Sequence, residues 1–352
     1  ILFDAMKGDV VLESPAISVI MGNYNHAHYL DQSIPAILNQ SLRPKELIIV
    51  DDGSTDNSVE IIEGFARKDP AIRFYKNEKN MGNVPTYMRA FAKVTGDYFH
   101  CASADDLILP GLFEKGTAML AKYPQAGMFS GVSKRIDGNG NEQVTSPEPP
   151  YISEMPCYIS PEKALELALD GVTWLCTQSA IWRMSSIREV GAYSPAFGNY
   201  IDEISAALIT LNCGTCFTSE ILGVSRVLEN SFSDKYRFDP KSFIDLMEDS
   251  EAVMRSECSE NLPASFIDTF RKRSLYQMGA MALNDWKSSG DECHDYLDRA
   301  LENPSLLDRI VLSASRALIT THKRFLKLFL YFRLRRLTGM MISKVVGRFK
   351  NK

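Results

Sequence analysis

Short apolar runs alternate with helix-type patterns over the first hundred residues of the chain. The apolar runs lie at 17–21, 47–50, 72–75 and 98–102, and the helical patterns lie near 30–39, 56–67 and 84–94. Strands and helices that alternate in this way predict a largely parallel sheet flanked by helices. Because crossover connections are right-handed, the carboxyl ends of these strands are expected at one edge of the sheet.

Carboxylates follow two of these predicted strands where each strand ends. Asp51 and Asp52 close the run 47–50, and Asp105 and Asp106 come shortly after 98–102. Ligands of open α/β sheets bind beyond the carboxyl ends of strands, and clustered oxygen atoms suit a hard divalent cation such as Mg²⁺ or Mn²⁺. The alternative interpretation is that these acids only cap the helices that follow.

Further motifs share the order and spacing of a known family. They comprise Ile17–Asn25, Val50–Asp56, Asn80–Gly82, Gly96–Tyr98 leading into Ser103–Asp106, and Ile181–Tyr193. Residues 15–232 thereby resemble the family 2 glycosyltransferases, which use nucleotide-activated sugars. The resemblance implies an α/β fold of the GT-A type, with a three-layer mixed, largely parallel sheet.

The resemblance also implies roles for residues at the strand ends. Contacts to the nucleotide-sugar are expected from Asn23, Tyr24, Asn25, Asp51, Asp52 and Ser103. Ser103 stands where the family often has the first Asp of an Asp-x-Asp-Asp motif, so its bond to a ribose hydroxyl lacks charge assistance. Asp105 takes the metal-ligand position and Asp106 is an adjacent second candidate, with Mg²⁺ or Mn²⁺ as the cofactor.

A third acidic site follows from the same resemblance. The family usually has a Glu-Asp pair at the start of a helix and a glycine about twelve residues later; here Asp202 and Glu203 precede Gly214 in reversed order. Either carboxylate can deprotonate an acceptor hydroxyl within hydrogen-bond reach. The sequence does not decide between them, and helix-terminal charge is the structural alternative.

The function implied is inverting transfer of a hexose from a nucleotide-diphosphate donor, by default UDP-linked, to a sugar or glycolipid hydroxyl in polysaccharide or glycoconjugate biosynthesis. A sugar nucleotidyltransferase would need a glycine-rich basic loop after its first strand, which residues 22–26 lack. The other alternative is a non-catalytic nucleotide-sugar-binding or scaffold protein with a decayed site. Ser103 and the reversed order of Asp202 and Glu203 are the evidence for it.

Composition and patterning divide the 352 residues into four predicted segments: a lead at 1–14, the GT-A domain at 15–235, a helical appendage at 236–304 and a basic amphipathic helical tail at 305–352. Within the second segment, the polar, proline-rich stretch 131–160 predicts a surface insertion. The appendage carries helical patterns at 240–257, 263–288 and 292–302. Seven cysteines without a framework pattern favour a reducing compartment and ordinary core thiols.

The end of the chain has an unusual charge pattern. Residues 321–352 contain ten Lys or Arg and no acid, although the whole chain has a formal charge of −5. Such a basic amphipathic helix predicts binding to an anionic membrane surface; docking on the acidic body is the alternative. An acidic body disfavours nucleic acid. Neither a signal peptide nor a spanning segment is apparent, so we expect a cytoplasmic protein, peripheral on the cytoplasmic membrane face.

Overall fold

The computed structural model describes residues 15–143, 152–170, 172, 177–228 and 240–284. The predicted lead at 1–14, the predicted helix at 292–302 and the basic tail lie outside these residues. In the described ranges, no helix has the length and apolar character needed to cross a membrane.

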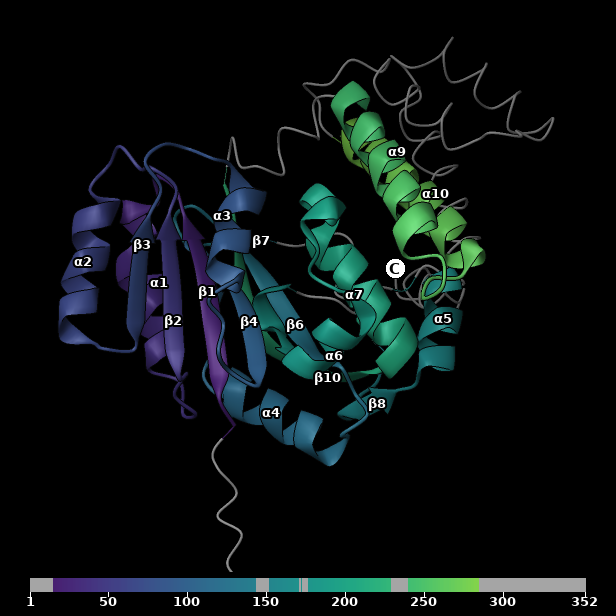
Figure 1. The fold of residues 1–352 in the computed structure, drawn as a ribbon, viewed down its shortest axis with the longest axis horizontal. Coiled ribbons are helices and arrows are strands. Elements are labelled where there is room, and N and C mark those ends of the chain that lie inside the picture. Colours follow the sequence, from purple (N-terminus) through teal and green to yellow (C-terminus); the bar gives the residue numbers. More distant parts are fainter. Residues whose placement is uncertain (1–14, 144–151, 171, 173–176, 229–239, 285–352) are drawn as a thin grey trace, which may run out of the picture.

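A ten-stranded mixed sheet runs through the centre of the molecule (Figure 1). Its strands are β1 (Ile17–Asn23), β2 (Glu46–Asp51), β3 (Ile72–Lys76), β4 (Tyr98–Ser103), β5 (Leu107–Ile108), β6 (Met128–Asp137), β7 (Glu142–Gln143), β8 (Cys157–Ile159), β9 (Ala180–Arg183) and β10 (Thr215–Val227). The main order is β3-β2-β1-β4-β9-β6-β10-β5, with β7 paired to β6 and β8 to β10. Strands β1 to β4 pair in parallel, whereas β9 is antiparallel to both of its neighbours.

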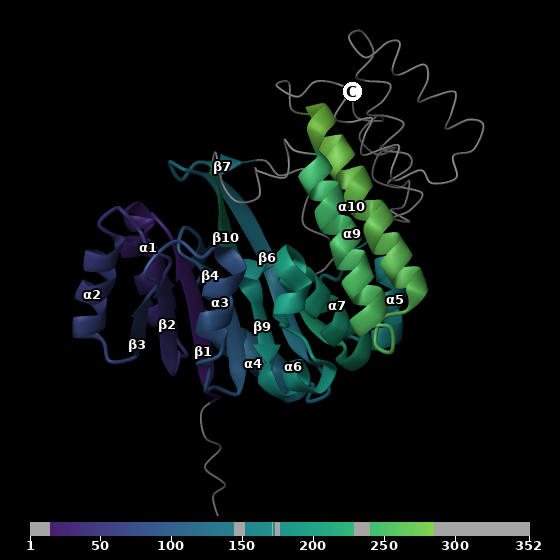
Figure 2. The same cartoon turned by 45° about the horizontal axis from the view of Figure 1, so that its top comes forward.

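Helices cover both faces of this sheet, so the predicted three-layer architecture is confirmed (Figure 2). They are α1 (Ala27–Leu38), α2 (Ser58–Lys68), α3 (Asn83–Phe91), α4 (Leu112–Lys122), α5 (Pro161–Leu169), α6 (Met184–Val190), α7 (Ile201–Cys213), α9 (Pro240–Glu257) and α10 (Ala264–Asn284), with 3₁₀ turns η1 (Thr177–Ser179) and η2 (Pro195–Tyr200). The predicted helices near 30–39, 56–67 and 84–94 correspond to α1, α2 and α3.

The alternation of side chains along the strands creates two hydrophobic cores. Val19 and Met21 of β1 face α1, α2 and α4, whereas Ile20 belongs to the core shared with α3, α5, α6, α7, α9 and α10. This is the period of two expected of a strand whose faces are both covered. The continuous apolar runs of the sequence therefore reflect burial on both sides of the sheet.

The register of the parallel strands brings their carboxyl ends together. Asn23 at the end of β1 pairs with Asp51 at the end of β2, and Gly22 pairs with Ser103 at the end of β4. The predicted nucleotide and metal segments therefore begin at one edge of the sheet, as the right-handed crossovers require.

The prediction of a surface insertion at 131–160 is wrong for its first residues and for 157–159, which form β8 and pair with β10. Strand β6 continues to Asp137 inside the sheet, where Val132 and Ile136 are buried. Polar residues in β6 suggested a surface loop, but they belong to a strand that pairs with β10 as far as Asp137. The expected hairpin turn follows directly, since the Gly140 amide donates to the carbonyl of Asp137. Residues 144–151 lie outside the described part.

The helical appendage packs on the side of the molecule that carries α5 and α7. Helices α9 and α10 run side by side and contact η2 and α5 respectively (Figures 1 and 2). Buried Phe270 of α10 places its ring 5.6 Å from that of Tyr200, the residue before α7. The appendage thus contacts the segment that leads into the predicted acid helix.

Candidate active site

Asp51 is the centre of a hydrogen-bonded group that joins the ends of β1 and β2. Its carboxylate accepts bonds from Asn23 Nδ2 at 2.8 Å, from the Ser54 hydroxyl at 2.5 Å and from the Ser54 amide at 2.9 Å. Asp51 and Asn23 are almost entirely buried. Because a buried carboxylate must be hydrogen-bonded, this group fixes the turn that follows β2.

Asp52 holds a different loop. Its carboxylate accepts hydrogen bonds from Asn77 Nδ2 at 2.7 Å, the Met81 amide at 2.8 Å and the Gly82 amide at 2.9 Å. Gly53 permits this approach: it has a φ of +73°, and a Cβ there would lie 2.8 Å from the carbonyl carbon of Lys79. Asp52 therefore organises the loop that leads into α3, a bonding role beyond the predicted ligand contact.

The turn after β1 presents the remaining predicted nucleotide residues. Asn25 has a φ of +57°, and its side-chain oxygen accepts hydrogen bonds from the amide of Thr55 at 2.7 Å and that of Asp56 at 3.4 Å. Asp56 in turn accepts from the Ala27 amide at the start of α1. These bonds hold Tyr24 with 41% of its surface exposed. Tyr24 and Asn25 thus lie at the open side of the edge.

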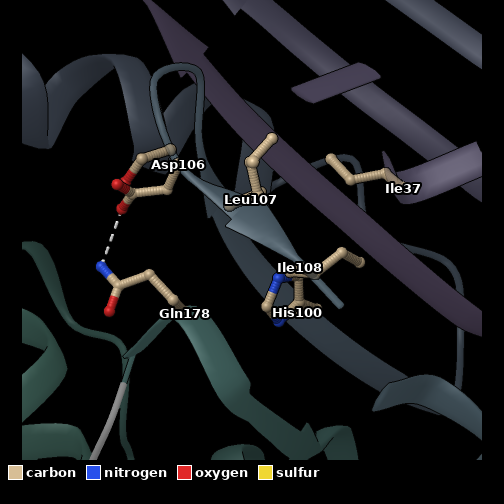
Figure 3. A pocket seen from close by; sticks show the side chains of 8 residues that line it. Ile37, His100, Asp106, Leu107, Ile108 and Gln178 are labelled. Atoms are coloured by element: carbon tan, nitrogen blue, oxygen red, sulfur yellow. Dashed lines mark hydrogen bonds between the residues drawn. The ribbon is translucent and has the colours of Figure 1, made fainter. Parts of the chain in front are cut away.

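The two predicted metal ligands differ in their surroundings, and Figure 3 shows the one that is buried, Asp106. Asp106 is buried, and its carboxylate accepts from the Arg226 amide at 2.7 Å and from Gln178 Nε2 at 2.9 Å. Burial, followed by the negative charge of Asp105, raises the pKa of Asp106 to about 7. Among the described residues, no donor bonds to the half-buried carboxylate of Asp105. Asp105 is therefore the more available ligand.

A small pocket lies behind this pair. Asp106, Gln178 and Ser103 line it together with His100 of β4 (Figure 3). His100 Nδ1 bonds to the carbonyl of Ala180, whereas Nε2 is buried and finds no partner among the residues that the structure describes. Burial lowers the pKa of His100 to about 4, so the ring is neutral at physiological pH. A neutral imidazole adds no positive charge beside the carboxylates.

Asp202 in the first turn of α7 is held from below by Tyr193. The Tyr193 hydroxyl donates to Asp202 Oδ1 at 3.1 Å, and its ring packs edge-on against Phe99 of β4, 4.9 Å between centroids. Burial raises the pKa of Asp202 to about 6, an effect that the Tyr193 hydroxyl opposes. Tyr193 has a φ of +62°, which is uncommon outside glycine. This strained residue ties the acid helix to the strand that ends at Ser103.

Glu203 has a more open position than its neighbour. Its side chain reaches solvent, and no described side chain donates to its carboxylate. The protein packed around it, followed by the negative charge of Asp202, raises the pKa of Glu203 to about 7, while the positive charge of Arg273 opposes the shift. A carboxylate with a pKa near neutrality that is open to an incoming hydroxyl suits a general base.

The structure gathers the predicted residues at two places on one side of the sheet. The ends of β1 and β2 bring Asn23 to Asp51, while β4 ends at Ser103, leads into Asp105 and also supports the tyrosine that bonds to Asp202. Sequence reasoning missed the residues that hold this arrangement, namely Ser54, Asn77, Gln178, Tyr193 and Arg226. Only Ser54 and Tyr193 lie inside a quoted motif and had a detectable signal.

Comparison with known proteins gives a family match over the first half of the chain. The model described as "Glycosyl transferase family 2" matches residues 18–189. The chain is 39% identical over 104 residues to an uncharacterized glycosyltransferase of Haemophilus influenzae, which covers 30% of the chain and 42% of that relative. It is 37% identical over 110 residues to the putative glycosyltransferase EpsE of Bacillus subtilis, covering 31% and 40%. These matches span less than half of either relative.

The fold has solved counterparts over most of its length. A fragment of S. aureus TarS in complex with UDP-GlcNAc superposes with a TM-score of 0.61. The superposition covers 92% of this chain and 90% of that one, at 16% sequence identity. At this identity the likeness establishes the fold, and it extends beyond the family match into the helical C-terminal part.

The raised pKa of Asp202 predicts a pH-dependent stability difference. The folded protein holds a proton on Asp202 between about pH 4 and 6 that the unfolded chain has lost, so this group destabilises the fold increasingly as pH rises. The free energy of unfolding of Asp202→Asn, relative to that of wild type, should therefore rise by on the order of 2 kcal/mol between pH 4.5 and 7.5. Urea unfolding at both pH values measures this, with exposed Asp97→Asn as the control. A stability difference that is the same at both pH values would contradict the prediction.

Proposed function

We propose that this chain, which belongs to glycosyl transferase family 2 through residues 18–189, is an inverting glycosyltransferase that moves a sugar from a nucleoside-diphosphate donor to an acceptor hydroxyl. The observation that carries the proposal is that a single strand, β4, is connected to both acidic groups. Strand β4 leads into Asp105 and Asp106 and, through Phe99, supports the tyrosine that bonds to Asp202.

The residues at the end of β4 fit a divalent cation. A cation of the Mg²⁺ type is held in proteins by one or two carboxylates together with substrate phosphates and water. Asp105 supplies a carboxylate without a described hydrogen-bond donor, and Asp106 is an already oriented neighbour. We propose Asp105 as the ligand and Asp106 as its support or second ligand. A bound Mg²⁺ or Mn²⁺ would neutralise the donor diphosphate and improve it as a leaving group.

The proposed reaction is one displacement at the anomeric carbon. The acceptor oxygen forms a bond to that carbon as the bond to the donor phosphate breaks, and the nucleoside diphosphate leaves with the electron pair. The acceptor proton passes to a carboxylate of the acid helix. Glu203 is the better base because it is open to solvent, whereas one oxygen of Asp202 already accepts from Tyr193.

We propose that the strand-end residues bind the base and ribose of the donor nucleotide, which we take to be UDP. Asp51 Oδ1 accepts one described hydrogen bond, and a carboxylate oxygen can accept two. Tyr24 and Asn25 border the open side, where a base can stack or bond, and Ser103 is the ribose contact. Support for UDP comes from TarS, which shares the fold and was solved with UDP-GlcNAc. Polysaccharide or glycoconjugate biosynthesis is the corresponding role.

The basic end of the chain adds a proposal about location. Its acid-free stretch 321–352 would attract an anionic leaflet, by about 1 kcal/mol per Lys or Arg near the surface. We propose that this stretch holds the protein on the cytoplasmic face of a membrane, next to a glycolipid acceptor. These residues lie outside the described structure, and the support is the sequence alone.

The metal assignment predicts the result of Asp105→Ala. Removing the available carboxylate should abolish the dependence of UDP binding on Mn²⁺, because the cation would lose its charged protein ligand. Isothermal titration of UDP with and without Mn²⁺ measures this. Asp97→Ala, a carboxylate lost just before the opposite end of β4, is the matched control and should bind like wild type. Unchanged Mn²⁺ dependence in Asp105→Ala would refute the assignment.

The base assignment predicts different effects for the two neighbouring acids. Glu203→Gln should leave UDP-sugar affinity near wild type while turnover falls by about 10²–10⁴-fold, as is typical when a general base is lost. Asp202→Asn should lower turnover less than Glu203→Gln does, since its amide oxygen can still accept from Tyr193. Steady-state transfer assays and donor titrations separate turnover from binding. A larger loss in Asp202→Asn would transfer the role to Asp202, and wild-type binding without turnover would favour a scaffold.

The location proposal predicts that removing residues 321–352 abolishes binding to anionic liposomes but spares activity on a soluble acceptor. Binding of the full chain should weaken as salt rises, because the charges are screened beyond about 8 Å at physiological ionic strength. Liposome co-sedimentation over a series of salt concentrations measures this, with neutral vesicles as the control. A full chain that stays off anionic vesicles at low salt would exclude the proposal.

A further inference from the structure

Helix α10 brings an arginine from the appendage to the acid helix. Phe270 of α10 is buried and contacts Tyr200, the residue before α7. Arg273 follows one turn later, and its guanidinium lies 5.7 Å from the centre of the Phe270 ring. Its charge acts on both Tyr200 and Glu203. Arg273 therefore lies beside the acid helix, close enough for its charge to act on the open carboxylate of α7.

One donor of the partly buried Arg273 side chain has no partner among the described residues. Its Nε is buried and meets no hydrogen-bond acceptor in the part of the chain that the structure describes, and burial lowers the pKa of the side chain. The neighbouring Arg271 on the same helix differs, because its Nε pairs with Glu251 at 2.9 Å. A buried donor of a charged side chain that meets no acceptor is costly unless a ligand supplies one.

Glu203 and Arg273 attract each other without making contact. Each affects the charged state of the other, yet they form no ion pair within 4.0 Å in the described structure. Direct pairing would have satisfied both groups and blocked the proposed base. The separation leaves each side chain available to a different group of one ligand.

We propose that Arg273 binds an anionic group, a phosphate or a carboxylate, that the acceptor carries next to the hydroxyl to be glycosylated. The inference rests on the proposed function, in which Glu203 takes the proton of that hydroxyl. The guanidinium would bond to the anion through two N–H groups, a geometry that arginine matches better than lysine. Arg273 would then select anionic acceptors and orient their hydroxyl towards Glu203.

Small acceptor mimics that share a hydroxyl and differ in charge test this directly. Glycerol phosphate, glycerate and glycerol are titrated calorimetrically into full-length protein saturated with UDP and Mn²⁺. Wild type should bind one or both of the anions and not glycerol, and the preferred anion identifies the group. Arg273→Gln should weaken that binding at least tenfold, and Arg273→Lys should recover part of it. Arg271→Gln, the matched control, should bind like wild type.

Two results would overturn the inference. One is that wild type and Arg273→Gln bind all three mimics equally, which includes the absence of any binding. The other is that Arg273→Gln loses affinity for UDP alone while anion binding is unchanged, which would assign the arginine to the donor diphosphate. Titrations of UDP alone and of the mimics without UDP separate the two proposals. A wild type that does not bind UDP rejects the donor proposal, whereas anion affinity independent of Arg273 rejects this one.

Discussion

The hydrogen bonding of two buried carboxylates is the constraint on which this site depends. Asp51 and Asp52 are adjacent in sequence, yet they bond in different directions, the first to Asn23 and Ser54 and the second to the loop before α3. A buried charge that loses its donors costs several kcal/mol. These two residues therefore fix three chain segments at one sheet edge before any ligand binds.

The fold could be predicted because its signals are local and repeat. Apolar runs and helical patterns defined the first four strands and three helices, and the acidic residues at the strand ends indicated which edge matters. The error at 131–160 came from the limits of the same signal. Strand β6 carries polar residues at positions where pairing with β10, distant in sequence, determines the structure. Such pairing leaves little trace in one segment considered alone.

The candidate site was predictable in its acids and not in their partners. Asp202 and Glu203 are neighbours in the sequence. Only the structure shows that Tyr193 donates a hydrogen bond to Asp202, whereas Glu203 is open to solvent. Asp106 likewise meets the backbone of Arg226, 120 residues away. Contacts of this kind depend on side-chain direction and long-range packing, which no motif spacing encodes. Arg273 lies further still, on a helix beyond the family match.

The family match ends at residue 189, before the acid helix and α10. The strand ends proposed to bind the nucleotide lie within it, and the residues proposed to meet the acceptor lie after it. Evolution can therefore change one half of the site while retaining the other. A lineage could acquire a new acceptor by drift or exchange of the C-terminal helices, without altering the activated sugar that it consumes. The boundary also suggests where functional chimaeras of related chains would tolerate a junction, in the turn between α6 and η2.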